Sequence, residues 1–356
     1  MKKTILLSAI LCGFAGSAAA QSSVTIYGIL DTGLALESGG SAGSVSKVTS
    51  GMASGSRLGF KGTEDLGGGL AANFLLESGV GVDGGVYNQG GIPFGRQAYV
   101  GLSGGFGAVS LGRQYTPQYV TLVMADPFAT GMSGDAANLM PNTGNAASRM
   151  DNTVKYVSPV MQGFTAELAY GFGEVAGSTS ASRQLGAALA YANGPFNIRL
   201  GYHNRNNDTA TVGNTENAKN TLLAATYDFS VVKVYFGYGV DKGLNSAPLR
   251  NVANPYGSLL APVASTDSTD TLLGVSVPFG LGTFLGSYIR KDDKTVKNQD
   301  ADQWALGYRY ALSKRTDIYT AYAHINNKRG AGYTVGSSIE AGSGDKAFQL
   351  GIRHSF

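Results

Sequence analysis

Side chains that could carry catalysis or bind a metal are few and scattered in this chain. Its three histidines, His203, His324 and His354, stand far apart, and its single cysteine is Cys12. A zinc site needs several such ligands together. His354 cannot act with the adjacent Ser355, because neighbouring residues of a strand point to opposite faces. The sequence therefore predicts no enzyme, no metal site and no cofactor.

Many charged residues of this chain stand at every second position, alternating with apolar residues. Arg57 and Lys61, for example, alternate with Leu58 and Phe60. A period of two is typical of β-strands with two different faces. The predicted inward charges, on the face opposite the apolar rows, are Asp31, Arg57, Lys61, Arg96, Arg149, Asp151 and Lys155.

Parity decides the predicted faces of two of the arginines. Arg96 has opposite parity to Tyr99, which we interpret as an inward position for Arg96. Arg113 shares parity with Val109 and Leu111 and so points outward. Either its strand has already ended, or Arg113 contacts another subunit.

Segments with this alternation recur along the whole chain after residue 20. Sixteen of them, each of about ten residues, are expected as strands. They lie near residues 23–36, 55–64, 69–80, 96–103, 106–114, 150–158, 163–173, 183–193, 196–204, 218–229, 231–240, 267–278, 282–292, 299–311, 316–326 and 347–356.

The connections between these segments alternate in length. Short ones lie near 65–68, 104–105, 194–195, 230 and 280–281, and long ones at 37–54, 81–95, 115–149, 174–182, 205–217, 241–266, 293–298 and 327–346. This layout predicts an all-β fold, a 16-stranded antiparallel transmembrane β-barrel with long external loops and both termini on the short-turn side. A β-sandwich is the alternative, but its strands usually have about five or six residues, whereas about ten tilted residues cross a membrane.

Composition agrees with an all-β chain and excludes several classes of protein. Charged residues make up only 14%, and the formal net charge of +3 does not suggest a nucleic-acid binder. The 52 glycines show no collagen period, and a single cysteine excludes a disulfide framework. No stretch after residue 20 approaches 18 consecutive apolar residues, so no transmembrane helix is predicted.

The first twenty residues are typical of a cleaved signal peptide. Lys2 and Lys3 precede a short apolar stretch, and Ala18 to Ala20 offer a small-residue cleavage site before Gln21. A lipoprotein would use Cys12, but Leu11 stands where a small residue is expected. We therefore expect residues 1–20 to be removed and residues 21–356 to form the barrel domain.

A barrel of sixteen strands is wide enough for an aqueous lumen, so the inward charges bear on what passes. Arg57, Arg96 and Arg149 could form a cluster on one wall, or they could be ordinary scattered lumen charges. The longest connection, 115–149, would narrow the bore if it folded inward, and its Asp126 and Asp135 would then face the arginines. Such a transverse field orients polar solutes and sets ion preference.

Several motifs resemble those of the trimeric general-diffusion porins of Gram-negative outer membranes, most closely the neisserial and β-proteobacterial type. They comprise residues 24–28 (VTIYG), 56–67 (SRLGFKGTEDLG), 96–102 (RQAYVGL), 111–117 (LGRQYTP) and the terminal Phe356. The similarity covers essentially all of residues 21–356. The strands between 183 and 326 are generic.

The resemblance implies a homotrimer of 16-stranded barrels whose third loop is folded into the lumen. By position, Arg57, Arg96 and Arg149 match the family's basic wall, Asp126 and Asp135 lie in the inward loop, and Phe356 matches the C-terminal aromatic read by the barrel-assembly machinery. Two departures concern the constriction. Ile29 stands where many members carry a basic residue, and residues 126–129 read DPFA where the enteric branch has PEFG.

The leading functional hypothesis is an outer-membrane porin for passive diffusion of small hydrophilic solutes and ions. Its expected partners are further copies of itself, outer-membrane lipid and lipopolysaccharide. Three arginines against two loop acids predict a mild anion preference, which Asp31 and Asp151 oppose. A substrate-specific outer-membrane channel and a structural or adhesive surface barrel remain as alternatives.

Overall fold

The computed structural model describes residues 23–141, 148–248, 264–336 and 340–356. The expected signal peptide 1–20 and Cys12 lie outside the described residues. Within them, no helix has both the length and the apolar character to cross a membrane.

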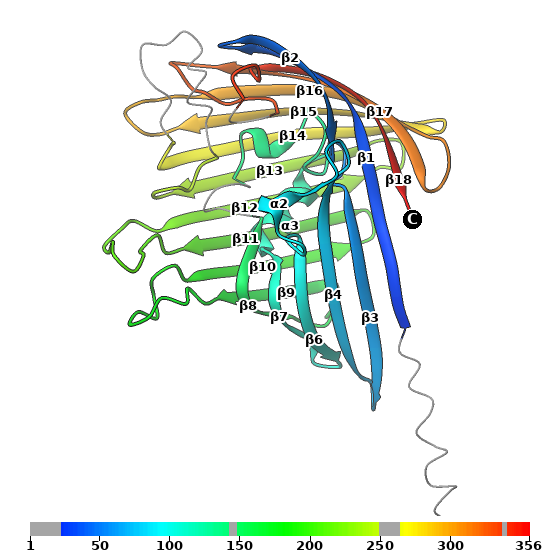
Figure 1. The fold of residues 1–356 in the computed structure, drawn as a ribbon, viewed down its shortest axis with the longest axis vertical. Coiled ribbons are helices and arrows are strands. Elements are labelled where there is room, and N and C mark those ends of the chain that lie inside the picture. Colours follow the sequence, from blue (N-terminus) through cyan, green and yellow to red (C-terminus); the bar gives the residue numbers. More distant parts are fainter. Residues whose placement is uncertain (1–22, 142–147, 249–263, 337–339) are drawn as a thin grey trace, which may run out of the picture.

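Antiparallel strands form one continuous sheet that closes on itself (Figure 1). Closure occurs at β1 (Ser23–Gly40), which pairs on one edge with β18 (Lys346–Ser355) and on the other with β2 (Gly43–Ser50) and β3 (Arg57–Gly67). The remaining strands are β4 (Leu70–Gly81), β5 (Val86–Tyr87), β6 (Gln97–Gly104), β7 (Gly107–Tyr115), β8 (Arg149–Val157), β9 (Phe164–Gly171), β10 (Gln184–Asn193), β11 (Phe196–Arg205), β12 (Ala218–Asp228), β13 (Lys233–Lys242), β14 (Asp267–Phe279), β15 (Gly282–Asp293), β16 (Ala301–Ala311) and β17 (Thr316–Asn327).

The wall of the barrel has sixteen strands, as predicted. The sheet contains eighteen assigned strands. However, β2 and β3 follow one another along a single edge of β1, and the two-residue β5 pairs only with the end of β4. The wall strands run from one long connection to the next short turn, which is the arrangement of an outer-membrane barrel.

The two faces of the wall have opposite chemistry. On β1, Val24 and Ile26 are 63% and 61% exposed on the outside, whereas Asp31 and Ala35 on the inside are fully buried. The outer surface is therefore an apolar band that only lipid or another apolar surface can cover. Aromatic pairs occur in this band, for example Phe284 with Tyr308 at 4.6 Å between ring centroids.

One expected loop is a strand instead. The sequence predicted a long connection at 37–54, but β1 continues to Gly40 and turns tightly into β2, which ends at Ser50. Alternation also continues through this hairpin, and Lys47 Nζ lies 3.0 Å from Glu37 Oε1. The true irregular segment is the short stretch from residue 51 to residue 56.

The C-terminal residue closes the seam of the barrel. Phe356 exchanges two backbone hydrogen bonds with Gly28, at 3.1 and 3.2 Å. Its ring lies over Gly28, where an added β-carbon would come within 2.3 Å of Phe356 Cζ. Glycine is thus required at position 28 for the terminal ring to pack on the outer face of β1.

We therefore expect Gly28→Val to lower the folded fraction after refolding and to destabilise the barrel by about 1–3 kcal/mol, because the ring must leave its place. Heat-modifiable migration in gel electrophoresis measures the folded fraction. Gly286→Ala is the matched control, since its added carbon would meet Val275 Cγ2 at an ordinary 3.5 Å. Equal folded fractions for both variants would contradict the role of Gly28.

Candidate functional site

The connection between β7 and β8 lies inside the barrel. It begins with helix α3 (Pro117–Ala125), which packs against the inner faces of β10, β11 and β12 (Figure 1). Thr116 caps the helix by accepting a hydrogen bond from the Tyr119 N–H at 3.1 Å, and Pro117 occupies the first turn. Both residues favour a helix start at this point. The described part of this connection, residues 115–141, therefore folds into the lumen as the resemblance implied.

Polar contacts attach the far part of this loop to the wall. A short 3-10 helix, η2 (Ala136–Asn138), follows the turn at residues 126–135. Asn138 Nδ2 donates to Gln303 Oε1 at 2.9 Å, and Gln303 Nε2 donates to the Gly134 carbonyl at 3.2 Å. At the loop tip, the Met132 N–H donates to the Met52 carbonyl.

Asp31 holds the segment that receives this loop tip. It is fully buried, and its carboxylate accepts the N–H groups of Ala53 and Ser54 at 3.0 and 2.7 Å. The Tyr319 hydroxyl donates to its other oxygen. Asp31 does lie on the inner face, as parity predicted, but it is covered and supports residues 51–56 rather than lining the pore.

The three predicted arginines come together on the wall formed by β3 to β8, where each lies at or just before the start of a strand. Arg149 Nε donates to the Arg96 carbonyl at 2.8 Å, and both guanidinium groups donate to the Tyr115 hydroxyl, at 2.6 Å from Arg96 and 3.2 Å from Arg149. Arg57 joins them through Glu77, which lies 4.0 Å from its Nη1. We call Arg57, Arg96 and Arg149 the arginine cluster.

Glu77 on β4 is the member of this site that the sequence analysis missed. Its carboxylate is 97% buried, accepts a hydrogen bond from Arg96 Nε at 2.7 Å, and accepts another from the Tyr27 hydroxyl at 2.7 Å. The alternation of β4 could have predicted that Glu77 points inward, because it has the same parity as Asn73 and Leu75, which lie on the inner face. One buried carboxylate therefore offsets only part of the charge of three guanidinium groups.

The parity argument for Arg96 was wrong, although Arg96 does belong to the cluster. Tyr99 also faces the lumen, where it lines a cavity with Tyr27 and Lys61. Arg96 precedes the first residue of β6, Gln97, so strand alternation does not fix its direction. The buried ion pair with Glu77 orients it instead.

The two loop acids occupy different environments. Asp126 is 99% buried and accepts N–H groups from Phe128, Thr130 and Ala136, at 2.9, 2.9 and 3.0 Å. It therefore fixes the turn of the loop and does not face the arginine cluster. Burial raises its pKa to about 6, although the three N–H donors oppose that rise.

Asp135 is only partly covered and lies at the start of η2, where its Oδ1 accepts the Ala137 N–H at 2.7 Å. Burial, followed by the charge of Asp126, raises its pKa to about 7. Its charge also raises the pKa of Tyr119. The ring of Tyr119 lies 5.0 Å from the ring of Tyr115, whose hydroxyl contacts the arginine cluster. Asp135 is thus the less buried of the two loop acids.

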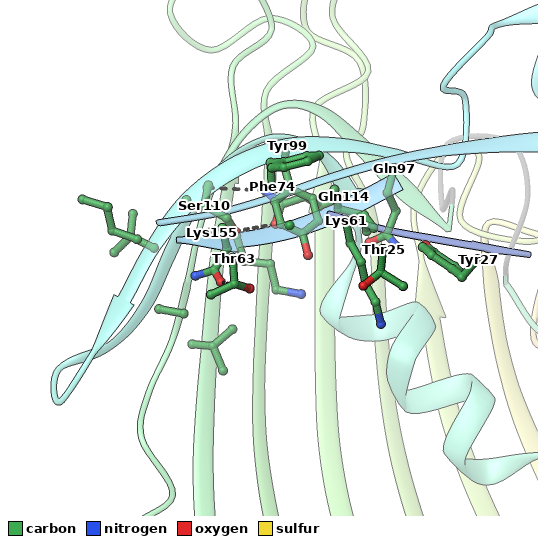
Figure 2. A pocket seen from close by; sticks show the side chains of 18 residues that line it. Thr25, Tyr27, Lys61, Thr63, Phe74, Gln97, Tyr99, Ser110, Gln114 and Lys155 are labelled. Atoms are coloured by element: carbon green, nitrogen blue, oxygen red, sulfur yellow. Dashed lines mark hydrogen bonds between the residues drawn. The ribbon is translucent and has the colours of Figure 1, made fainter. Parts of the chain in front are cut away.

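A cavity of about 710 Å³ lies on the inner wall on the short-turn side of the cluster (Figure 2). Its lining includes Lys61, whose Nζ is 5.3 Å from the Tyr27 ring centroid, and Lys155. Lys155 Nζ is 3.2 Å from Glu167 Oε2, so its charge is shared. Among the described residues that line this cavity, none carries a carboxylate. Both predicted lysines therefore face the lumen.

Asp151 does not share their face, contrary to the prediction. A β-bulge sets Arg113 of β7 opposite both Asp151 and Asn152 of β8, and Asn152 has a φ of 52°. A bulge shifts the alternation by one residue. Asp151 therefore turns to the outer face, where it forms an ion pair with Arg113.

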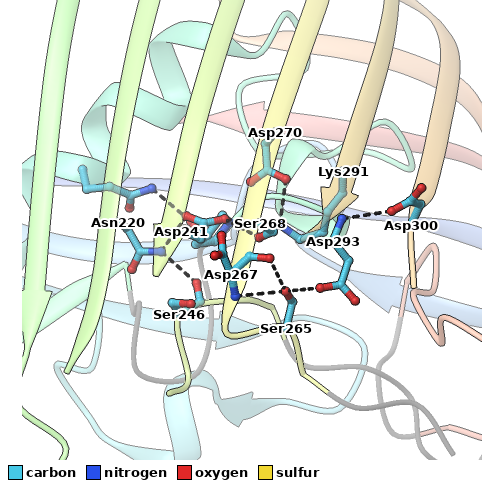
Figure 3. A network of polar contacts seen from close by, with 12 residues as sticks. Asn220, Asp241, Ser246, Ser265, Asp267, Ser268, Asp270, Lys291, Asp293 and Asp300 are labelled. Atoms are coloured by element: carbon cyan, nitrogen blue, oxygen red, sulfur yellow. Dashed lines mark hydrogen bonds and ion pairs between the residues drawn. The ribbon is translucent and has the colours of Figure 1, made fainter. Parts of the chain in front are cut away.

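Carboxylates on the wall behind the loop are buried together with a lysine (Figure 3). Lys291 Nζ contacts Asp270 Oδ1 at 2.7 Å and Asp241 Oδ2 at 3.2 Å, and all three side chains are almost fully buried. Asn220 Nδ2 donates to Asp241 Oδ1 at 2.7 Å. Both acids contact the same lysine and are buried in the wall, so they are not exposed to the lumen.

The arrangement places fixed positive charge on one wall of the lumen. Fixed guanidinium groups on one wall oppose a loop whose main acid is turned inward. Such a field raises the local concentration of anions. Across the described ranges, no cluster of three or more His, Cys, Asp or Glu residues could hold a metal ion.

Comparisons with known proteins agree with this geometry. A model of the Gram-negative porin family matches residues 7–330. Outer membrane porin protein 32 of Delftia acidovorans is 35% identical over 376 residues, with full coverage of both chains. The major outer membrane protein P.IB of Neisseria lactamica is 27% identical, over 95% of this chain and 96% of the relative. A solved structure described as an anion-selective porin from Comamonas acidovorans has a TM-score of 0.76 and 32% identity, covering 94% of this chain and 100% of the other.

The raised pKa of Asp135 predicts a pH-dependent pore charge. Below pH 7 the carboxyl is protonated and neutral, and above pH 7 it adds a negative charge to the loop. We expect the anion-to-cation permeability ratio, measured from reversal potentials, to fall between pH 5.5 and pH 8.5 with a midpoint near 7. The pKa of Asp126 is also raised, to about 6, but its carboxyl is buried inside the loop.

Asp135→Asn keeps the acceptor oxygen for Ala137 and should make the ratio nearly independent of pH. Asp65→Asn, at an exposed short turn, is the control and should titrate like the unmodified protein. A pH profile that is unchanged by Asp135→Asn would show that another group controls the pore charge.

Proposed function

We propose, for a chain that belongs to the Gram-negative porin family, that its channel is narrowed between loop 115–149 and the arginine cluster. The family, the barrel fold and the outer-membrane location predicted from the sequence are confirmed, and the channel serves passive diffusion. The proposal concerns which residues form the constriction and what they favour.

The observation that carries the proposal is the imbalance of charge at the cluster. Three arginines meet one buried carboxylate, Glu77, while Asp126 is buried in the loop. Arg57 is more available than Arg96, since its side chain is 22% exposed against 8%, and its contact with Glu77 is long, at 4.0 Å. We infer a preference for small anions, and the relative from Comamonas acidovorans is itself described as anion-selective.

Neutralising the cluster tests this inference directly. Arg57→Gln should lower the anion-to-cation permeability ratio, and the triple variant with Arg96→Gln and Arg149→Gln should lower it further, by about tenfold in total if each charge contributes about 0.5 kcal/mol. Glu77→Gln is the opposite change and should raise the ratio. Reversal potentials of refolded protein in planar bilayers under a salt gradient measure both.

The same recordings separate the alternative functions. Conductance that rises in proportion to salt is expected of a general-diffusion pore. Conductance that saturates with one solute would favour a substrate-specific channel. Well-folded barrels without conductance would favour a structural or adhesive barrel. An unchanged reversal potential in the triple variant would remove the three arginines from the constriction.

We also propose that the functional unit is a homotrimer, with the Arg113–Asp151 pair at the subunit contact. Arg113 lies six residues after the start of β7, about 20 Å along a strand that tilts by about 45°, which places it near mid-bilayer. A charged side chain facing lipid there costs about 2–4 kcal/mol. A neighbouring subunit would remove this ion pair from the lipid.

Reversing one charge of this pair should weaken the trimer. Asp151→Arg alone sets like charges together and should increase the monomer fraction in detergent, measured by analytical ultracentrifugation. Adding Arg113→Asp restores opposite charges and should restore the trimer. Lys242→Ala, which removes an exposed charge at the loop end of β13, is the control. Intact trimers in the single variant would place the contact elsewhere.

The remaining partners follow from the same proposal. Outer-membrane lipid and lipopolysaccharide would cover the rest of the apolar outer face. The barrel-assembly machinery would read the strand that ends at Phe356, and small hydrophilic solutes and ions would pass through the lumen. We expect no enzymatic activity and no binding of nucleic acid.

A further inference from the structure

Residues 117–128, the first part of the connection between β7 and β8, rest on a row of glycines. Successive inner-face positions on five strands are glycine where the loop passes, namely Gly186 on β10, Gly201 on β11, Gly237 on β13, Gly274 on β14 and Gly307 on β16. We call these five residues the glycine seat. On the two intervening strands, the inner-face residues beside the row include the small Ala224 and Ser287.

Four glycines of the seat meet a residue of the loop at a distance that leaves no space for a side chain, and the fifth, Gly237, leaves little. An added β-carbon would lie 2.7 Å from Pro117 Cδ at Gly186, 2.3 Å from Thr121 Oγ1 at Gly201, and 3.3 Å from Ala125 Cβ at Gly237. It would lie 2.7 Å from Pro127 Cδ at Gly274 and 2.7 Å from Phe128 Cε1 at Gly307. Distances under about 3 Å require one of the two groups to move.

The loop residues in these contacts also follow a regular spacing. Pro117, Thr121 and Ala125 are four residues apart and so lie on one face of α3. Pro127 and Phe128 continue the same track after the helix, and Phe128 is fully buried. One face of residues 117–128 therefore follows the row of glycines across the wall, from β10 to β16.

We propose that the glycine seat sets the cross-section of the pore by fixing how far the loop stands from the wall. The loop lies between the seat and the lumen, so any side chain added to the seat moves the loop toward the arginine cluster and narrows the passage. The five glycines are thus positioning residues, which act on permeating solutes only through the loop. This inference rests on the proposed role of the loop as the constriction.

A graded series of alanine variants tests the proposal in the full-length protein. Single-channel conductance should decrease in the order of the contacts: slightly for Gly237→Ala, and by about 1.5-fold or more for Gly274→Ala and Gly307→Ala. Gly286→Ala faces away from the loop and should conduct like the unmodified protein. Gly237→Ala keeps the test valid if the more crowded variants fail to fold.

A compensating change distinguishes a shifted loop from a damaged barrel. Phe128→Leu removes the ring atoms that an alanine at position 307 would meet. The double variant Gly307→Ala/Phe128→Leu should therefore conduct more like the unmodified protein than Gly307→Ala does. General damage to the barrel would instead add to the effect of the first change.

Crystal structures of the variants separate failure of this inference from failure of the proposed constriction. A displaced loop with lower conductance supports both. A displaced loop with unchanged conductance would overturn the loop as the constriction, and with it the role of the seat. A loop that stays in place in Gly274→Ala and Gly307→Ala, or a double variant no better than Gly307→Ala, would overturn the glycine seat alone.

Discussion

The requirement that every backbone N–H and C=O group within the bilayer be paired governs this structure. A sheet can meet it only by closing, because an open edge would leave a row of unsatisfied groups in lipid. Here β1 supplies both edges, pairing with β18 on one side and with β2 and β3 on the other. The terminal Phe356 completes the seam against Gly28. Closure then forces the division into an apolar outside and a polar inside.

A closed wall of sixteen strands leaves a lumen that its own side chains cannot fill, so the chain fills part of it with loop 115–149. The wall must then accept a second layer of protein on its inner face. It does so with small residues and glycines where α3 passes, and with polar side chains such as Gln303 and Arg199 at the sides. The pore is the space that this inner layer leaves against the opposite wall.

Charge is distributed according to how much water each group retains. Asp126 accepts three backbone N–H donors, and Lys291 contacts both Asp241 and Asp270, and all four side chains are buried within the protein. Burial of unpaired charges would cost several kcal/mol each. Under the proposed function, the groups that act on a passing solute include Arg57, Lys61 and Asp135. A modest number of exposed charges can dominate the field of a pore whose other charges are matched.

The strand number, the faces of most strands, the inward lysines and the three clustered arginines could all be predicted from the amino-acid sequence. This was possible because alternation with a period of two is a local property, which the residues of each strand carry alone. The same rule misplaced Asp151, because a bulge between β7 and β8 shifts the count, and it misread Arg96, which precedes its strand. The tertiary structure was needed to show that Asp31 and Asp126 hold loop segments by accepting backbone N–H groups. It was also needed to show that Glu77 lies among the arginines and that five glycines face the loop. Those roles depend on contacts between segments far apart in the chain, and no local pattern encodes which distant segment will cover a given side chain.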